Sequence, residues 1–330
     1  MPRGTDAWRE GWALACNALT DAGCLGVGIG AAAAVVSRHD LFSTLAGRLR
    51  QPGPAGLRPR RPARAGSARD GYAAALEALA AGLDLGGARP EKGKVAVVGC
   101  FMDRNEGDHR GNVAELERML RALGLEPASV WLSGRPHETL REARRAGAVL
   151  SLPHGREAAR VLARRLGVSV VEAGLPFGLQ ATRRFVETLG REFGRGKQAD
   201  AFIRRELDLV APRLEWSVPH AFLNRRFVFA GDPHYGAAFA ELIAELGGRT
   251  EVLDLPPHGL GPDAADLLVA DTRVLERTRP RTAWLEFGFP CELTHFLKDE
   301  PFLGFPGALG FLSRAANEVS KGFCRRMLRT

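Results

Sequence analysis

The chain contains one pattern twice: an apolar run, a Gly-Asp pair, an amphipathic stretch, a glycine, and a second apolar run. In the first copy the apolar runs span residues 94–99 and 128–132, and in the second they span residues 226–230 and 250–255. Near-continuous apolar runs are typical of parallel strands that are covered on both faces. A strand, a crossover helix and a parallel strand form a βαβ unit, so the repeat predicts two similar α/β domains.

Further apolar runs and amphipathic stretches alternate around the two copies, as expected for doubly wound sheets with right-handed crossovers. The predicted additional strands span residues 148–152, 168–171, 266–270 and 283–285, and the predicted helices span residues 113–123, 157–166, 180–192 and 197–214. The last of these helices is long enough to connect two domains. The sequence therefore predicts two Rossmann-like, parallel-sheet domains.

Composition is that of a soluble globular protein, with 45% apolar and 25% charged residues in a chain of 330. The net charge of +8 comes almost entirely from arginine, because only five of the 46 basic residues are lysine. These arginines are scattered, and the one dense run, at residues 58–69, is typical of an exposed linker. We therefore expect no nucleic-acid partner.

The sequence also predicts a cytoplasmic protein without a membrane partner. Charged residues interrupt any apolar segment of a signal peptide near the start, and Asn17 and Asp21 interrupt the small-residue stretch at 13–36. Five cysteines in a chain of this length do not indicate a disulfide framework, so we expect reduced thiols.

Nucleotide-binding motifs are weak in this sequence. Residues 24–30 carry closely spaced glycines, yet no clean apolar strand precedes them, which argues against a dinucleotide loop. A G-x-x-x-x-G-K-[ST] phosphate loop does not occur anywhere in the sequence, so we expect no ATP site.

The richest stretch for chemistry spans residues 282–317. Its strand ends at Glu286 and is followed by a Gly-Phe-Pro turn, Cys291, His295 and an aromatic, glycine-rich loop with Phe302 and Phe305. Ligands of open α/β sheets bind beyond the carboxyl ends of the strands. We expect the two phenylalanines to line a flat apolar ligand.

Two more candidates follow predicted strands. Cys100 comes directly after residues 94–99, and His154 follows the strand at 148–152. Histidine is the usual acid, base or metal ligand, so His295 and His154 are the predicted catalytic residues, converging on one cleft if the two domains face each other. Cys100, Cys291, Phe302 and Phe305 are the predicted cofactor-binding residues, although a core position for Cys100 is nearly as well supported.

Four further motifs occur in order along the chain. They are a Val-Val-Gly strand end followed by Gly107-Asp108, the segments P-F-G-L-x-A-T-x-x-F and F-V-F-A-G-D-P-H, and the stretch G-F-P…H…P-F-L-G-F-x-G-A. In their sequence and their order these motifs resemble the nitrogenase component 1 family. That family includes the nitrogenase molybdenum–iron protein subunits, the dark-operative protochlorophyllide and chlorophyllide reductases, and the nickel-tetrapyrrole reductive cyclase. The resemblance covers about residues 10–320, with a shortened first domain.

The resemblance implies a domain division and a set of metal ligands. It suggests a truncated cluster-type α/β domain at residues 1–90, a central α/β domain at 91–200, and a C-terminal α/β domain with its linking helix at 201–330. Cys24 occupies a place like that of a cluster-ligating cysteine, and Cys16 is a weaker candidate. A 4Fe–4S cluster needs four soft ligands, so two cysteines suffice only if a second subunit supplies the others. The family's molybdenum cofactor is ligated by a cysteine in the loop where this chain has Ser151–His154, so that mode of binding is not expected.

The resemblance also implies a function: a component 1-like subunit of an ATP-dependent two-component reductase. A separate P-loop iron–sulfur ATPase would deliver electrons through a cluster to a substrate or metallocofactor in the inter-domain cleft. The expected assembly is a homo- or heterodimer, or a tetramer, with a homologous component 1-like subunit. Two alternatives remain open: a non-catalytic scaffold or assembly protein that binds a metallocofactor or tetrapyrrole, and a simple ligand-binding module with two α/β lobes.

Overall fold

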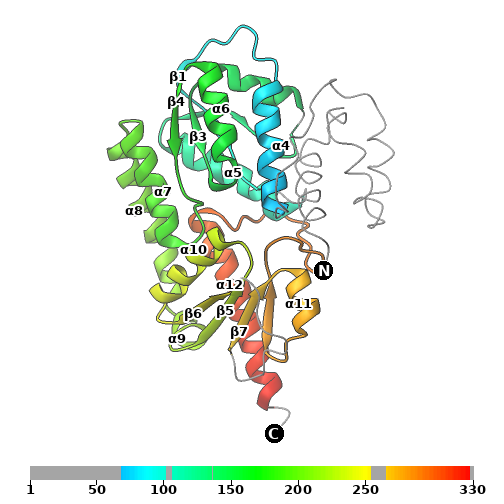
Figure 1. Ribbon diagram of the computed structural model, residues 1–330. Coiled ribbons are helices and arrows are strands. Elements are labelled where there is room, and N and C mark those ends of the chain that lie inside the picture. The colour runs from blue at the N-terminus through cyan, green and yellow to red at the C-terminus, as the bar shows by residue number, and fades with distance from the viewer. Residues whose placement is uncertain (1–67, 102–105, 136, 254–264, 328–330) are drawn as a thin grey trace. The chain divides into compact units, whose positions relative to one another are not determined.

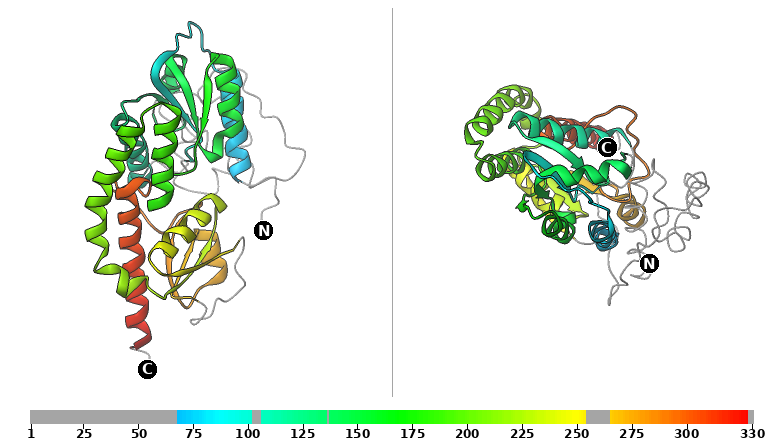
Figure 2. Two further views of the ribbon diagram at one scale, coloured as in Figure 1. Left: turned by 90° about the vertical axis from the view of Figure 1, so that its left-hand side faces the viewer. Right: turned by 90° about the horizontal axis from the view of Figure 1, so that it is seen from above.

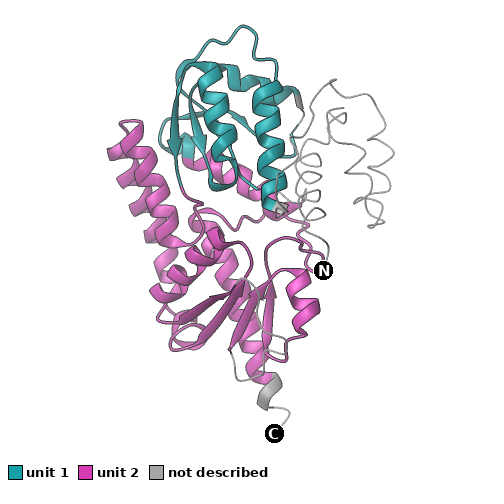
Figure 3. Cartoon of the chain, viewed as in Figure 1, with its two compact units in different colours: residues 1–105, 120–173 teal, residues 106–119, 174–330 magenta. Residues whose placement is uncertain are grey.

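The computed structural model describes residues 68–101, 106–135, 137–253 and 265–327 (Figure 1). Cys16, Cys24 and most of the expected truncated domain lie outside these residues. The described residues form two compact units (Figure 3). The first contains the described residues before Asn105 together with Leu120–Ala173, and the second contains Glu106–Met119 and the residues from Gly174 onward.

Unit 1 is built on a four-stranded parallel sheet with the order β2-β1-β3-β4. The strands are β1 (Glu91–Val98), β2 (Glu126–Val130), β3 (Ala146–Ser151) and β4 (Ser169–Glu172). The last five residues of β1 are buried, because neighbouring strands flank β1 and both of its faces are covered. Helices α4 (Ala68–Gly82) and α6 (Arg156–Leu166) pack against each other, and two 3-10 segments, η2 (His137–Arg145) and η3 (Pro153–Gly155), flank β3.

Unit 2 repeats the same arrangement, with a parallel sheet in the order β6-β5-β7-β8. Its strands are β5 (Arg226–Ala230), β6 (Arg249–Leu253), β7 (Leu267–Ala270) and β8 (Ala283–Glu286). Its helices are α7 (Leu179–Glu192), α8 (Gly196–Leu214), α9 (Ser217–Ala221), α10 (Pro233–Glu245), α11 (Thr272–Thr278) and the long α12 (Gly304–Met327). Helix α12 packs on β8 and on helices α7, α8 and α9 (Figure 2).

The core of unit 2 contains a cluster of aromatic rings. Phe287 lies at its centre, with ring centroids 5.2 Å from Phe177, 5.1 Å from Phe302 and 5.1 Å from Phe311. Tyr235 completes the cluster at 5.3 Å from Phe287. The Phe177 ring is stacked on Phe287 and the other three rings meet it edge to face. Such contacts add to the stabilisation from burial, so the cluster fixes the start of the segment that follows β8.

The predicted α/β class with two parallel sheets is confirmed. Helix α5 (Gly107–Ala122) begins six residues earlier than its apolar spacing indicated, and η2, α9 and α11 were not predicted. Helices α7 and α8 belong to the second compact unit, whereas the expected division placed residues up to 200 in a central domain. Among the described residues, no helix is both long and apolar enough to cross a membrane.

Candidate functional site

The strand order of each unit places a switch point between its two central strands: β1 and β3 in unit 1, and β5 and β7 in unit 2. Loops diverge there at the carboxyl ends of the strands, which is where open α/β sheets bind ligands. These two edges are therefore where the predicted site residues are expected to lie.

The edge of unit 1 is closed by two glycines. A Cβ on Gly99 would lie 2.4 Å from the nitrogen of Gly155 and 2.6 Å from the carbonyl oxygen of Leu152, so the loops after β1 and β3 are in backbone contact. The guanidinium of Arg156 donates to the carbonyl oxygens of Ser151 and Ala173, the second at 2.7 Å. Backbone atoms therefore fill the place between the two strand ends.

Cys100 and His154 lie at this closed edge. Burial raises the pKa of the Cys100 thiol to about 12, so it is protonated at neutral pH. His154 is 5% exposed, and its ring centroid is 5.4 Å from that of Phe101. Both residues have the surroundings of core residues. Their predicted roles in cofactor binding and catalysis stay predictions.

The edge of unit 2 is polar. Asp232 caps α10 by accepting from the His234 N–H at 2.9 Å, and Asp271 caps α11 by accepting from the Val274 N–H at 2.9 Å. Burial raises the pKa of Asp271 to about 6, with a smaller contribution from the nearby charge of Glu286. This edge thus carries carboxyl groups where unit 1 carries glycine contacts.

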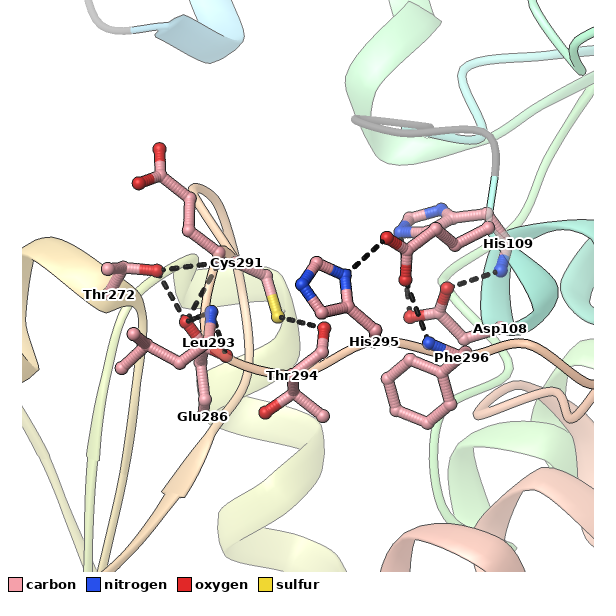
Figure 4. Close-up of polar contacts among 11 residues, drawn as sticks. Asp108, His109, Thr272, Glu286, Cys291, Leu293, Thr294, His295 and Phe296 are labelled. Carbon is pink, nitrogen blue, oxygen red and sulfur yellow. Dashed lines mark hydrogen bonds and ion pairs between the residues drawn. The ribbon is translucent and has the colours of Figure 1, made fainter. Parts of the chain in front are cut away.

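His295 lies on the loop that follows β8, in unit 2 (Figure 4). Its Nδ1 is 2.8 Å from Oε1 of Glu106, and the other carboxylate oxygen of Glu106 accepts from the Phe296 N–H at 2.8 Å. The Gly107 N–H donates back to the Phe296 carbonyl at 2.9 Å. The two segments therefore bind each other through both backbone and side chain.

The contact with Glu106 assigns the tautomer of His295. A carboxylate accepts but does not donate, so the proton of a neutral imidazole belongs on Nδ1, and Nε2 keeps its lone pair. The side chain is 61% exposed, so solvent and ligands can reach it. A histidine oriented in this way by a carboxylate can bind a metal or accept a proton through Nε2.

Cys291 and the two phenylalanines differ from His295 in exposure. The Cys291 side chain is buried, with its sulfur 4.0 Å from the carbonyl oxygen of Thr294, in an irregular loop rather than a helical turn. Phe302 belongs to the aromatic cluster, and Phe305 is 0% exposed, with its ring centroid 6.3 Å from that of Phe202. In this structure both phenylalanines contact protein. The roles of all three residues in cofactor binding stay predictions.

Within the described part of the chain, no three His, Cys, Asp or Glu side chains come together as a metal site. Of its cysteines, Cys100 and Cys291 are buried and in different units, and Cys324 is exposed on α12. The described residues therefore do not form a cluster site, and the predicted ligands Cys16 and Cys24 lie outside them.

Sequence reasoning missed three residues that hold the loop after β8. Glu106 binds His295, and Thr272 and Glu286 accept hydrogen bonds from backbone N–H groups at the start of the loop. Thr272 and Glu286 had a usable signal, because each follows or ends an apolar strand at the carboxyl edge. Glu106 had none, since it is 189 residues from His295 in sequence.

The model of the "Nitrogenase component 1 type Oxidoreductase" family matches residues 61–255, which is more than half of the chain. The chain belongs to this family. Over 226 residues it is 24% identical to the nitrogenase molybdenum-iron protein alpha chain of Methanothermobacter thermautotrophicus (strain Delta H), covering 60% of this chain and 48% of that relative. The chain thus spans about half the length of the curated relative that it matches.

Two solved structures share the component 1 fold. Nitrogenase Cp1 at pH 6.5 superposes with a TM-score of 0.62 and 17% identity, covering 89% of this chain and 74% of that one. Nitrogenase Cp1 at pH 5 gives a TM-score of 0.57 and 12% identity, covering 78% and 62%. At these identities the likeness establishes the fold alone.

Proposed function

We propose that the chain is a component 1-like subunit of an ATP-dependent two-component reductase, and that it binds a substrate or metallocofactor at the loop edge of unit 2. Family membership supports the reductase class. The observation that carries the location is His295, which is exposed and oriented through Nδ1 by Glu106. A metallocofactor would find there a nitrogen ligand whose tautomer is already set.

Electrons would come from a separate P-loop iron–sulfur ATPase, since the sequence contains no phosphate-loop motif of its own. The proposed assembly is a dimer or tetramer with a homologous subunit, and the proposed location is the cytoplasm. A shared 4Fe–4S cluster would require Cys24, with Cys16, and further ligands from the second subunit.

A scaffold or assembly role is the second candidate. In this role the chain would bind a metallocofactor or tetrapyrrole at the same loop without turnover.

Anaerobic purification followed by iron and sulfide analysis separates the two roles. A reductase subunit should contain iron and sulfide in proportion to protein, sediment as a dimer or larger, and lose most of the iron in Cys24→Ser, because a hydroxyl is a poor ligand for iron in a cluster. Cys324→Ser is the matched control, because Cys324 is exposed on α12. Iron-free protein that sediments as a monomer after reconstitution would contradict the shared-cluster reductase.

A further inference from the structure

The loop that carries His295 is fixed at both ends by buried or partly buried carboxylates. Glu106 binds its far end, at His295 and Phe296. Glu286, the last residue of β8, binds the near end (Figure 4). Both residues belong to unit 2, so the contacts are internal to one compact unit.

Glu286 is 1% exposed, and its carboxylate receives an unusual number of donors. Its Oε1 accepts from the Glu292 N–H at 3.0 Å and from the Leu293 N–H at 3.1 Å. Its Oε2 accepts from the same Leu293 N–H at 3.0 Å. Two consecutive backbone amides therefore converge on one carboxylate, two residues before His295.

Thr272 completes the network. Its hydroxyl donates to Oε1 of Glu286 and accepts from the Glu292 N–H at 2.9 Å. Its own backbone N–H donates to the Pro290 carbonyl at 2.9 Å. The first turn of α11 is thereby joined to the loop at two points.

The charge of Glu286 strengthens these contacts. Burial alone would raise the pKa of Glu286, but hydrogen bonds from Thr272, Leu293, Thr294 and Glu292 outweigh it and hold the pKa below its usual value. The carboxylate is therefore ionised at neutral pH. Hydrogen bonds to an ionised acceptor are about twice as strong as those between neutral groups.

We propose that Glu286, supported by the Thr272 hydroxyl, is the positioning residue that sets the course of the loop and thereby holds His295 within reach of Glu106. The inference rests on the proposed function only for the role of His295 as a ligand, because the loop contacts themselves involve protein atoms alone. Without the carboxylate, the Leu293 amide would lose its acceptor and the Glu292 amide would keep only the Thr272 hydroxyl, which is costly in a partly buried place. The backbone of the loop would then change its path, and the contact between Nδ1 of His295 and Glu106 would be weakened.

The test is NMR of the full chain, with three variants and two readouts. Glu286→Gln keeps the size of the side chain but removes its charge, Thr272→Val removes the hydroxyl at constant shape, and Thr272→Ser keeps the hydroxyl. The first readout is hydrogen exchange of the Glu292 and Leu293 amides. The second is the tautomer of His295, read from its ring nitrogen shifts.

In the wild type we expect protected amides and a proton on Nδ1 of His295. Glu286→Gln and Thr272→Val should each speed exchange of the two amides by about tenfold or more, and shift His295 toward a mixture of tautomers. Thr272→Ser should behave as the wild type. If Glu286→Gln does not fold, Thr272→Val tests the same inference by the same two readouts.

Unchanged exchange and an unchanged tautomer in Glu286→Gln, or in Thr272→Val alone, would overturn the inference. Faster exchange with an unchanged tautomer would also overturn it, since Glu286 would then act on the loop but not on His295. None of these results depends on a bound ligand. The proposed ligand site fails separately, if His295→Ala keeps all of the bound metal of the wild type.

Discussion

The two sheets share a strand order and an all-parallel pairing, yet their carboxyl edges are built differently. In unit 1 the loops after β1 and β3 touch through Gly99 and Gly155, and the Cys100 thiol is buried and protonated. In unit 2 the corresponding loops, after β5 and β7, carry Asp232 and Asp271. Strand β8 ends at the buried Glu286, and the loop that follows it presents an exposed His295.

The difference teaches that topology indicates where a site can form, whereas the residues at the edge decide whether it is open. Backbone packed against backbone leaves no room for a ligand atom. Buried carboxylates, in contrast, use their hydrogen-bonding capacity to hold a loop in place. The comparison favours structural support at the edge of unit 1 and ligand binding at the edge of unit 2.

The largest expected effect tests whether the aromatic residues of unit 2 are ligand walls or core. Phe305 is fully buried, so Phe305→Ala should lower the free energy of unfolding by about 3–5 kcal/mol. Urea denaturation followed by circular dichroism measures this. A loss below about 1 kcal/mol would instead support the prediction that Phe305 lines a ligand.

A smaller loss should follow from adding a single methyl group at the closed edge of unit 1. Gly99→Ala would place a Cβ against backbone atoms and also strain a residue with φ of 96°, so we expect a loss of about 2–4 kcal/mol. Gly93→Ala is the matched control, because Gly93 has φ of 88° but no atom within 4 Å of the added Cβ. Equal losses in the two variants would show that the edge is not closed by contact.

The edge of unit 2 should be recognisable by its pH dependence. The pKa of Asp271 rises from 3.8 to about 6 on folding, so the unfolded chain releases this proton first and stability falls as the pH rises through that window. Asp271→Asn keeps a capping oxygen without the charge. It should therefore be more stable than the wild type by about 1–3 kcal/mol at pH 8, with the difference vanishing below pH 4. A difference in stability that does not change with pH would show that the pKa of Asp271 is not raised by burial.

The smallest effect concerns the guanidinium that bridges two carbonyls in unit 1. Arg156→Lys keeps the charge but cannot reach the Ser151 and Ala173 oxygens together, so we expect a loss of about 1–2 kcal/mol. Arg183→Lys, in an exposed pair with Glu187, should cost less than about 0.5 kcal/mol. Thermal melts of the two variants measure the difference, and equal melting temperatures would count against this bridge.

The sequence predicted the elements of the fold better than the contacts of the site. Apolar runs such as residues 226–230 predicted a buried strand directly, because a strand that is buried on both faces consists of consecutive apolar residues. Helix α5 began earlier than expected, since its first turn is polar and therefore lacks apolar spacing. The short helix α11 was missed because seven residues give too few positions for a helical period.

The candidate site was predicted only in part, for a physical reason. His295 could be placed beyond a strand end, but its partner Glu106 comes from a segment far away in the chain, and no local pattern links the two. Phe305 was predicted to face a ligand, because an aromatic residue in a glycine-rich loop has the same local pattern whether it lines a ligand or fills a core. Only the packing around it distinguishes the two.

The most direct test of the proposed edge in unit 2 is metal retention by His295→Ala after anaerobic purification, measured by elemental analysis together with the melting temperature. His220→Ala is the matched control, because His220 is also exposed in unit 2 but lies on α9. We predict that His295→Ala loses the part of the bound metal that Cys24→Ser keeps, while its melting temperature stays within about 2 °C of the wild type. His220→Ala should keep both its metal and its melting temperature. Full metal retention in His295→Ala, at an unchanged melting temperature, would contradict a ligand site at this loop.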